Sequence, residues 1–271
     1  MHDAIVECVK RNSVVLREAW RVGDLDPSIK ANGTVISRMD ARIEDEIRRV
    51  IAHVDPEAII VGEELGSSEP SANRRDGHPL YVIDPIDGTH ACTNGASSFA
   101  IVVERIASNR EDVEAYIALP AFEELVRVDG RTATLSSGRR MSRLLDRRGR
   151  TFSANDQLLC DAKNHHDVDS RFPGKIRSFG STAHHAVEVA RGRYLAMLFP
   201  SLAPWDALPV LALMDAVRGS VAILGGRKVT IEDFLEGKLE GADAPILVAG
   251  HPSVLAQLPQ YFPWRIPLRI S

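Results

Sequence analysis

Cysteine is scarce in this chain: three cysteines occur in 271 residues, at Cys8, Cys92 and Cys160. Their wide and irregular spacing predicts neither a disulfide framework nor a cysteine-based metal site. We expect a reducing compartment, in which Cys92 and Cys160 are inert thiols.

Long apolar runs are also missing. No stretch approaches the roughly 20 apolar residues that are needed to cross a bilayer. The first residues, Met1 to Glu7, carry acids before any apolar run of the kind that a signal peptide has. We therefore expect a soluble, cytoplasmic protein with no membrane partner.

The chain has no excess of positive charge, since 33 Lys and Arg stand against 37 Asp and Glu. A phosphate backbone is bound mainly through basic residues, so a nucleic acid polymer is not an expected partner. The one basic run lies in residues 139–150, which hold six arginines. It is either a solvated or interface segment or an anion-binding arm, and the lack of interleaved aromatic residues favours the first.

The remaining composition is that of an ordinary globular chain, with 44% hydrophobic and 26% charged residues. We find neither an internal repeat nor a low-complexity linker. The expected organisation is an N-terminal α+β half, residues 1–135, and a C-terminal α/β half, residues 136–271, within one compact unit.

The spacing of apolar residues predicts alternating helices and strands, and therefore a layered α/β sandwich. We expect a loop over residues 23–33. We also expect residues 124–128 to pair with the strands before them across a turn at Asp129-Gly130. The predicted helices cover residues 3–22, 41–53, 182–191 and 207–217, and the predicted strands cover 58–61, 80–83, 99–104, 115–119, 124–128, 194–199 and 221–224.

Acidic residues follow two of these strands directly. Glu63 and Glu64 come after strand 58–61, and Asp84 and Asp87 come after strand 80–83. Pro85 and Gly88 predict a tight turn that keeps Asp84 and Asp87 close, with the Ile86 carbonyl between them. Such an all-oxygen set suits Mg²⁺ or Mn²⁺. The plainer alternative is an aspartate-rich turn that caps itself.

The two acidic pairs together favour the metal. If the two strands are neighbours, their acids converge at one edge of the sheet. Crowded carboxylates repel one another unless a cation lies between them.

Three segments in this order resemble the signatures of the inositol monophosphatase family, which belongs to a wider superfamily of lithium-sensitive, magnesium-dependent phosphatases. They are Glu63-Glu64, the hexapeptide from Asp84 to Thr89, and Trp205-Asp206. The resemblance covers roughly residues 5–255, and segments 34–40, 180–183 and 190–194 are also similar to family segments. It implies an αβαβα sandwich of the inositol monophosphatase and fructose-1,6-bisphosphatase type, two or three Mg²⁺ per site (with Mn²⁺ as a substitute), a homodimer and lithium sensitivity.

Carried over position by position, the resemblance implies the following roles. Thr89, backed by Asp40, orients and deprotonates the attacking water, and Glu63 is counted with them as catalytic. Lys30 matches the family's lysine loop, and the amides of Gly88 and Thr89 hold phosphate oxygens. One Mg²⁺ is bound by Glu63, Asp84 and the Ile86 carbonyl, and a second by Asp84, Asp87 and Asp206. A third Mg²⁺, bound more weakly, also uses Glu63 as a ligand. Taken alone, Asp206 is either a helix N-cap or a ligand.

The substrate contacts are where the match is weakest. Phe199 stands seven residues before Asp206, where inositol-cleaving members carry an acid that binds sugar hydroxyls. An apolar ring there predicts a leaving group with an apolar or aromatic face, such as a nucleoside or a modified sugar. His90 is either a substrate contact or a turn residue. With Phe199 and His90, the expected substrate contacts are Gly180, Ser181 and Thr182.

The other histidines are expected to have packing or surface roles. We expect one of the two histidines at the start of a helix, His184 and His185, to point inward and the other to be exposed to solvent. We expect His165 and His166 to lie in a polar loop.

The function predicted from the sequence is Mg²⁺-dependent hydrolysis of a small phosphorylated metabolite by metal-activated water. The alternatives within the superfamily are a nucleotide 3′-phosphatase and a sugar bisphosphatase. A phosphatase-like protein that binds without turnover is the non-enzyme alternative. The complete acid set argues against it, because a protein that only binds has no need for so many repelling carboxylates.

Overall fold

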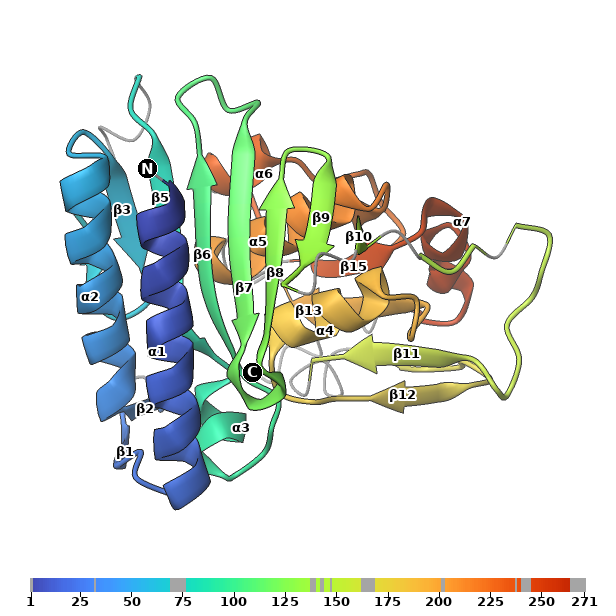
Figure 1. The fold of residues 1–271 in the computed structure, drawn as a ribbon. Helices are drawn as coiled ribbons and strands as arrows, with labels where there is room; N and C mark the ends of the chain where they lie inside the picture. The colour runs from blue at the N-terminus through green and yellow to red at the C-terminus, as the bar shows by residue number, and fades with distance from the viewer. Residues whose placement is uncertain are drawn as a thin grey trace, which may run out of the picture.

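The computed structural model describes residues 2–31, 33–68, 77–136, 140, 141, 144–146, 148–161, 169–200, 203–236, 238, 239 and 245–263 (Figure 1). The helices are α1 (His2–Val22), α2 (Arg38–Val54), α3 (Thr89–Thr93), η2 (Pro120–Phe122), α4 (Thr182–Ala190), α5 (Pro204–Ala216), α6 (Ile231–Leu235), α7 (Pro252–Leu255) and η4 (Leu258–Gln260).

The strands form two large sheets and one small ribbon. The ribbon pairs β1 (Pro27–Ile29) with β2 (Val35–Ser37). The larger sheet contains β3 (Ile59–Gly62), β4 (Gly66–Ser67), β5 (Leu80–Asp87), β6 (Ala100–Ile106), β7 (Val113–Leu119), β8 (Glu124–Asp129), β9 (Thr132–Leu135) and β10 (Arg140–Met141). The smaller sheet contains β11 (Gln157–Cys160), β12 (Lys175–Arg177), β13 (Ala196–Pro200), β14 (Ser220–Ile223) and β15 (Ile246–Gly250).

Helices α1 and α2 cover one face of the larger sheet, as Figure 1 shows. Both helices carry a stripe of apolar side chains three or four residues apart, which is the spacing that places them on one face. In α2 the stripe is Ile43, Ile47 and Ile51, all fully buried. It packs against strand residues such as Ile83 and Ile101 in a first core.

The larger sheet has the strand order β10-β9-β8-β7-β6-β5-β3-β4. Strands β3 and β5 run parallel, with Val61 opposite Val82. Strands β5 to β9 form antiparallel pairs in chain order. The carboxyl ends of β3 and β5 therefore meet at the same edge of the sheet.

Helices α4 and α5 lie between the two sheets, in a second core that joins residues from both halves of the chain. Every residue of α4 is buried, and α5 is apolar almost all round, which is typical of a helix enclosed on its whole circumference. The smaller sheet, of order β12-β11-β13-β15-β14, follows these helices. A third core on its outer face includes Val254 and Leu255 of α7 and Leu258 of η4.

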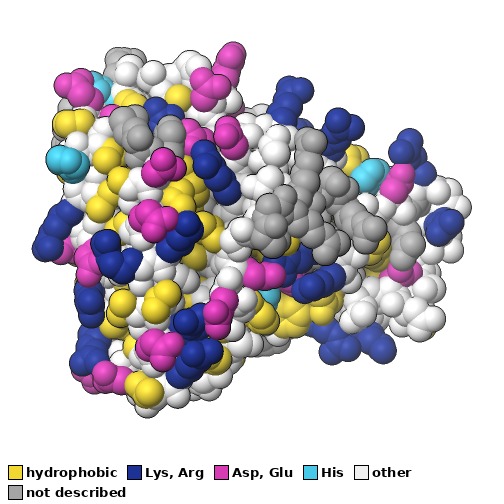
Figure 2. Space-filling view, viewed as in Figure 1, with side chains coloured by type: hydrophobic (Ala, Val, Ile, Leu, Met, Phe, Trp, Pro, Cys, Tyr) yellow, Lys and Arg dark blue, Asp and Glu magenta, His cyan; other side chains and the backbone are white. Residues whose placement is uncertain are grey.

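The layers are therefore helices, sheet, helices, sheet and helices, and the expected αβαβα sandwich is confirmed. None of the helices in the described residues is long and apolar enough to cross a bilayer. On the face in Figure 2, basic and acidic side chains are interspersed over α1 and α2.

Several predicted element boundaries were wrong for identifiable reasons. Helix α2 begins at Arg38, before the predicted start, because Ser37 and Asp40 form a capping box. The turn at Asp129-Gly130 joins β8 to the unpredicted β9, whereas η2 joins β7 to β8. The predicted loop over 23–33 contains β1, and strands β11, β12 and β15 were not predicted.

Candidate active site

Three aspartates meet at the end of β5. One carboxylate oxygen from each of Asp84, Asp87 and Asp206 lies within 4.8 Å of the other two. Asp84 and Asp87 belong to β5, and Asp206 belongs to the first turn of α5. Asp84 and Asp87 are buried and Asp206 is half-buried.

A bulge in β5 brings its two aspartates together. Asp84 pairs with Val102 of β6 and Asp87 pairs with Ala100, so three steps on β5 match two steps on β6. Residues three apart in a regular strand face opposite sides, and one extra residue restores them to the same side. The predicted tight turn was wrong, because the strand continues through the motif to Asp87.

The start of α4 holds Asp87 in place. Its carboxylate accepts hydrogen bonds from the Ser181 hydroxyl (2.6 Å) and from the amides of Thr182 (3.0 Å) and Ala183 (2.6 Å). Ser181 is also the N-cap of α4, accepting from the His184 amide at 3.1 Å. Ser181 and Thr182, which we expected to contact substrate, thus use these groups to fix a site aspartate.

Gly88 allows β5 and α4 to approach. Its φ of 89° is in the left-handed region, which favours glycine. A Cβ at this position would lie 2.7 Å from the Gly180 carbonyl oxygen. Gly88 is the N-cap of α3, so the amides expected to hold phosphate do lie at the start of a helix.

The helix geometry removes one of the two interpretations of Asp206. The N-cap of α5 is Ala203, and Asp206 follows it in the first turn. Asp206 is therefore not the N-cap, and its carboxylate is one of the three clustered oxygens.

Thr89 and Asp40 form a hydrogen-bonded pair beside the cluster. The Thr89 hydroxyl lies 3.0 Å from Asp40 Oδ1 and 2.9 Å from the Ile86 carbonyl oxygen. A hydroxyl has one hydrogen, so it donates to one of these acceptors at a time. The other oxygen of Asp40 accepts from the Ser37 amide (2.8 Å) and hydroxyl (2.6 Å), which fixes the carboxylate with Oδ1 toward Thr89.

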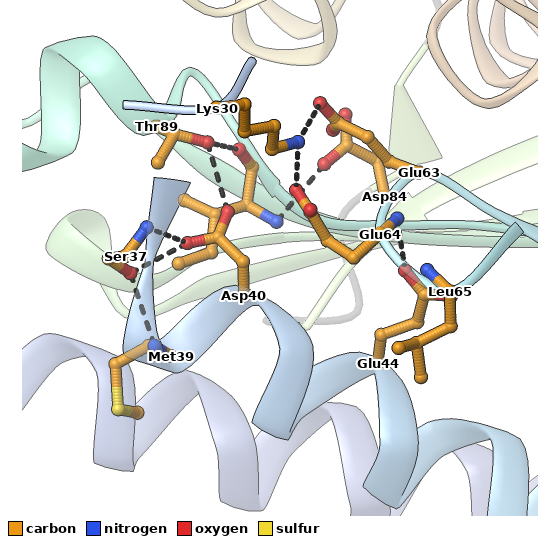
Figure 3. A network of polar contacts seen from close by, with 11 residues as sticks. Lys30, Ser37, Met39, Asp40, Glu44, Glu63, Glu64, Leu65, Asp84 and Thr89 are labelled. Carbon is orange, nitrogen blue, oxygen red and sulfur yellow. Dashed lines mark hydrogen bonds and ion pairs between the residues drawn. The ribbon is translucent and has the colours of Figure 1, made fainter. Parts of the chain in front are cut away.

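Glu63 and Glu64 lie beside this pair, as Figure 3 shows. Strands β3 and β5 are parallel neighbours, so the expected convergence of the two acidic motifs is confirmed. The Lys30 ammonium bridges the two glutamates, 2.6 Å from Glu64 Oε1 and 3.5 Å from Glu63 Oε1.

Burial and mutual repulsion make these acids hold their protons more strongly than usual. Burial, followed by the charges of Glu63, Asp87 and Asp206, raises the pKa of Asp84 well above its ordinary value. Burial also raises the pKa of Asp40 and that of Glu63 to about 7, against the lowering effect of Lys30. Burial raises the pKa of Asp87, although its three donors oppose the shift.

This donor set fits a divalent cation. It is composed of oxygen atoms, which Mg²⁺ prefers as ligands. The charged forms of Asp84 and Asp87 are disfavoured while no positive charge lies between the clustered carboxylates. A hard cation supplies that charge.

Three other residues were predicted to contact the substrate. Phe199 is fully buried in the second core, so its ring has no exposed surface to offer a substrate. His90 is exposed on α3, with its ring 3.4 Å from the Asn94 amide nitrogen. Gly180 is exposed just before α4.

The expectation of one solvent-exposed histidine in α4 was wrong, because that helix is enclosed by both sheets. His184 and His185 are both buried. His184 Nδ1 lies 2.8 Å from the Ser98 hydroxyl, and His185 Nε2 accepts from the Phe179 amide at 2.9 Å. His165 and His166 lie outside the described residues, as do Arg139, Arg143 and Arg147 of the basic run.

Two residues that support the site were not predicted. Ser37 had a readable signal, since Ser37 and Asp40 have the spacing of a capping box. Glu44 had a weaker one: it stands four residues after Asp40 and therefore shares its face of α2.

Comparison with known proteins agrees with this geometry. The sequence profile of the inositol monophosphatase family matches residues 1–247. A histidinol-phosphatase of Chlorobaculum parvum is 26% identical over 75% of this chain and 78% of its own length. A fructose-1,6-bisphosphatase/inositol-1-monophosphatase of Aquifex aeolicus is 25% identical over 77% and 79%. The crystal structure of the extragenic suppressor protein SuhB from Bartonella henselae superimposes with a TM-score of 0.76, at 19% identity over 96% of both chains.

Proposed function

The chain belongs to the inositol monophosphatase family and is a phosphoric monoester hydrolase, and from this premise we propose that it hydrolyses a small phosphorylated metabolite with the help of Mg²⁺. The observation that carries the proposal is the convergence of Asp84, Asp87 and Asp206 within 4.8 Å, next to the Thr89–Asp40 pair. Acids and a proton acceptor side by side are what the hydrolysis requires.

Five residues would hold the metal ions: Glu63, Asp84, Asp87 and Asp206 through carboxylates, and Ile86 through its carbonyl. Two or three Mg²⁺ are expected, and Mn²⁺ is an expected substitute. Bound there, Mg²⁺ would make the attacking water more acidic and neutralise charge on the phosphate.

Thr89 and Asp40 would handle the proton. With its hydrogen donated to Asp40 Oδ1, the Thr89 oxygen is left as an acceptor toward the attacking water. As the water attacks, Thr89 passes its own proton to Asp40 and takes one from the water. The raised pKa of Asp40 suits it as the final acceptor.

The remaining residues would bind the substrate or orient the acidic side chains. The amides of Gly88 and Thr89, at the start of α3, are placed to donate to phosphate oxygens. Lys30 would hold the Glu63 and Glu64 carboxylates near one another and balance their charge. His90, exposed next to Thr89, and Gly180 are the expected contacts to the leaving group.

The leaving group is the part to be found by experiment. The burial of Phe199 removes the argument for an aromatic-faced substrate. The names of relatives define the panel: histidinol phosphate, fructose 1,6-bisphosphate and inositol 1-phosphate, with nucleoside 2′- and 3′-phosphates added to represent the nucleotidase alternative.

The test is phosphate release from this panel with Mg²⁺, with chelator, and with Mg²⁺ plus Li⁺. We expect release that needs Mg²⁺ and is inhibited by Li⁺, and the highest kcat/KM identifies the substrate class. Asp87→Asn, prepared in parallel, should lose turnover and so exclude a contaminating phosphatase. Equal release by Asp87→Asn and wild type, or release that survives chelator, would overturn the proposal. Mg²⁺ binding without any release would favour the binding protein.

We further infer that the chain acts as a cytoplasmic homodimer and that residues 1–135 and 136–271 unfold as one unit. The second core supports unfolding as one unit, because it contains residues of both halves. Light scattering on the purified protein tests the dimer, and coincident thermal transitions by circular dichroism and tryptophan fluorescence test unfolding as one unit. A monomeric mass or two separated transitions would contradict them.

A further inference from the structure

Three charged residues stand four positions apart on α2: Asp40, Glu44 and Arg48. Asp40 and Glu44 have no exposed surface, and the Arg48 side chain is 15% exposed. Residues at this spacing share one face of a helix. In Figure 3 both acids rise from α2 toward the end of β5 and the turn after β3. The proposed reaction uses Asp40 and leaves Glu44 without a role.

Glu44 holds the backbone of the turn that carries Glu63 and Glu64. Its Oε2 accepts from the Glu64 amide at 2.8 Å, and its Oε1 accepts from the Leu65 amide at 3.2 Å. Arg48 donates from Nε to Glu44 Oε1 at 2.8 Å, and from a terminal nitrogen to the Gly66 carbonyl. We call Glu44 and Arg48 the α2 clasp. A buried carboxylate with several donors is a rigid anchor, because every bond it loses leaves a buried charge unsatisfied.

Gly62 shows that strand and clasp are fitted to one another. A Cβ at Gly62 would lie 2.0 Å from Glu44 Oε1. Any other residue at the end of β3 would therefore displace the carboxylate from its place. The backbone of Gly62 has a negative φ, so close approach and not backbone conformation is what requires a glycine here.

The backbone is fixed on both sides of Glu63. The Glu63 amide donates to the Ile83 carbonyl of β5 at 3.2 Å, and the next amide, of Glu64, donates to Glu44. The direction of the Glu63 side chain is then set by the backbone, and it points toward Lys30 and Asp84 (Figure 3).

We propose that Glu44, supported by Arg48, is a positioning residue for the metal site: it fixes the turn from which Glu63 reaches the cations. The inference rests on the proposed function and extends it to a residue that touches neither metal nor substrate. It makes α2 a common frame, because Asp40 places Thr89 and Glu44 places Glu63 from the same helix face.

The test is Glu44→Gln, measured by calorimetric titration with Mg²⁺ in the absence of substrate. The amide keeps the shape of the side chain but loses one acceptor oxygen, so one of the two turn amides loses its partner. Groups that orient metal ligands typically contribute about 10–100-fold to metal affinity. We expect the Kd for Mg²⁺ to rise by about 10-fold or more, and kcat at saturating Mg²⁺ to change much less. Hydrogen exchange at the Glu64 and Leu65 amides should become faster.

Asp45→Asn is the matched control. Asp45 is the next residue on α2, its side chain is 44% exposed, and it pairs with Arg49 on the outer face of the helix. The same loss of one charge there should leave Mg²⁺ affinity at the wild-type value. Gly62→Ala should reproduce the effect of Glu44→Gln, and the double variant should be little worse than either single one, because both changes remove the same contact.

The outcomes separate this inference from the proposed function. A wild-type protein that binds no Mg²⁺ and releases no phosphate would refute the proposed function itself. A wild-type protein that does both, with Glu44→Gln at wild-type Mg²⁺ affinity, would overturn the α2 clasp alone. A lower melting temperature with unchanged affinity would also overturn it, since a merely structural role predicts that result. If Glu44→Gln does not fold, Arg48→Gln decides by the same measurements.

Discussion

Asp40 is a residue whose two oxygens have separate tasks. One accepts from the amide and hydroxyl of Ser37, and the other faces Thr89. The rotamer of Asp40 is therefore fixed by the same capping box that starts α2. The proposed proton relay thus depends on a helix cap, and its geometry is set before any substrate binds.

Thr89→Ala and Asp40→Asn should each lower kcat by about 10²–10⁴-fold, the range of general base catalysis. Thr89→Ser keeps the hydroxyl and is the matched control, which should retain most of the wild-type activity. Because the two residues act as one unit, the double variant should lose little more than either single variant. Steady-state rates at saturating Mg²⁺ measure this, and fully additive losses would contradict a shared proton path.

Among single residues, the acidic motifs could be predicted from the sequence and the substrate contacts could not. Asp84, Asp87 and Asp206 come together because each follows or opens an element with a readable apolar pattern. Phe199 was misread because both faces of β13 are covered: Met197 and Phe199 face the second core and Ala196 and Leu198 the third. The sequence of a short strand does not show that both of its faces are enclosed. Glu44 was missed because its contacts to the turn are with the backbone amides of Glu64 and Leu65, which leave no trace in the sequence.

At the start of α4 one residue, Ser181, has two structural roles. Ser181 caps the helix and also donates to Asp87. Ser181→Ala should therefore cost about 0.5–2 kcal/mol of stability through the lost cap, and in addition weaken Mg²⁺ binding. Ser253→Ala, beside the N-cap of α7 and away from the site, is the control for stability alone. A stability loss with unchanged Mg²⁺ affinity would show that Asp87 is held well enough by the two amides.

Strand β6 contains an acid that nothing in the described residues satisfies. Both oxygens of Glu104 are buried without a hydrogen-bond partner, and burial raises the pKa of its carboxyl well above the ordinary value. Since the folded pKa is raised, the folded state retains a proton that the unfolded state releases, so stability falls as the pH rises above the ordinary glutamate range.

Glu104→Met should therefore stabilise the protein by about 1–3 kcal/mol near pH 8, the cost of an unpaired polar group, and by less near pH 5. Denaturant unfolding at the two pH values measures the difference. Glu111→Gln, in the exposed loop before β7, should have no effect at either pH. A gain that is independent of pH would contradict the raised pKa.

Long helices and internal strands of the larger sheet could be predicted because their apolar periodicity extends over several residues. The short strands of the smaller sheet could not. β15, which lies between β13 and β14, is a five-residue apolar run that has no alternation to distinguish strand from helix. The bulge in β5 was read as a turn because Pro and Gly favour both.

For the molecule as a whole, binding of metal and release of protons should be linked. Burial raises the pKa values of Asp84, Asp87 and Glu63, the last to about 7. These groups therefore destabilise the metal-free fold increasingly as the pH rises from the ordinary carboxylate range through neutrality. A bound cation favours their charged forms and opposes that loss.

The melting temperature in chelator should consequently be lower near pH 8 than near pH 6, and saturating Mg²⁺ should raise it more near pH 8. Asp206→Asn, which removes one of the clustered carboxylates, should reduce the Mg²⁺-induced shift. Differential scanning calorimetry at constant ionic strength measures both quantities. Equal Mg²⁺-induced shifts at the two pH values would contradict the linkage.

The contact between Asp87 and Ser181 joins residues 94 positions apart, and Asp206 comes from still further along the chain. Contacts of such long range form only after the intervening chain has been ordered, which makes them late events in folding. A partly folded molecule in which only the larger sheet is complete therefore lacks Asp206 and the Ser181 contact to Asp87, and its site is incomplete. The specific activity of a preparation then counts the molecules that have finished folding.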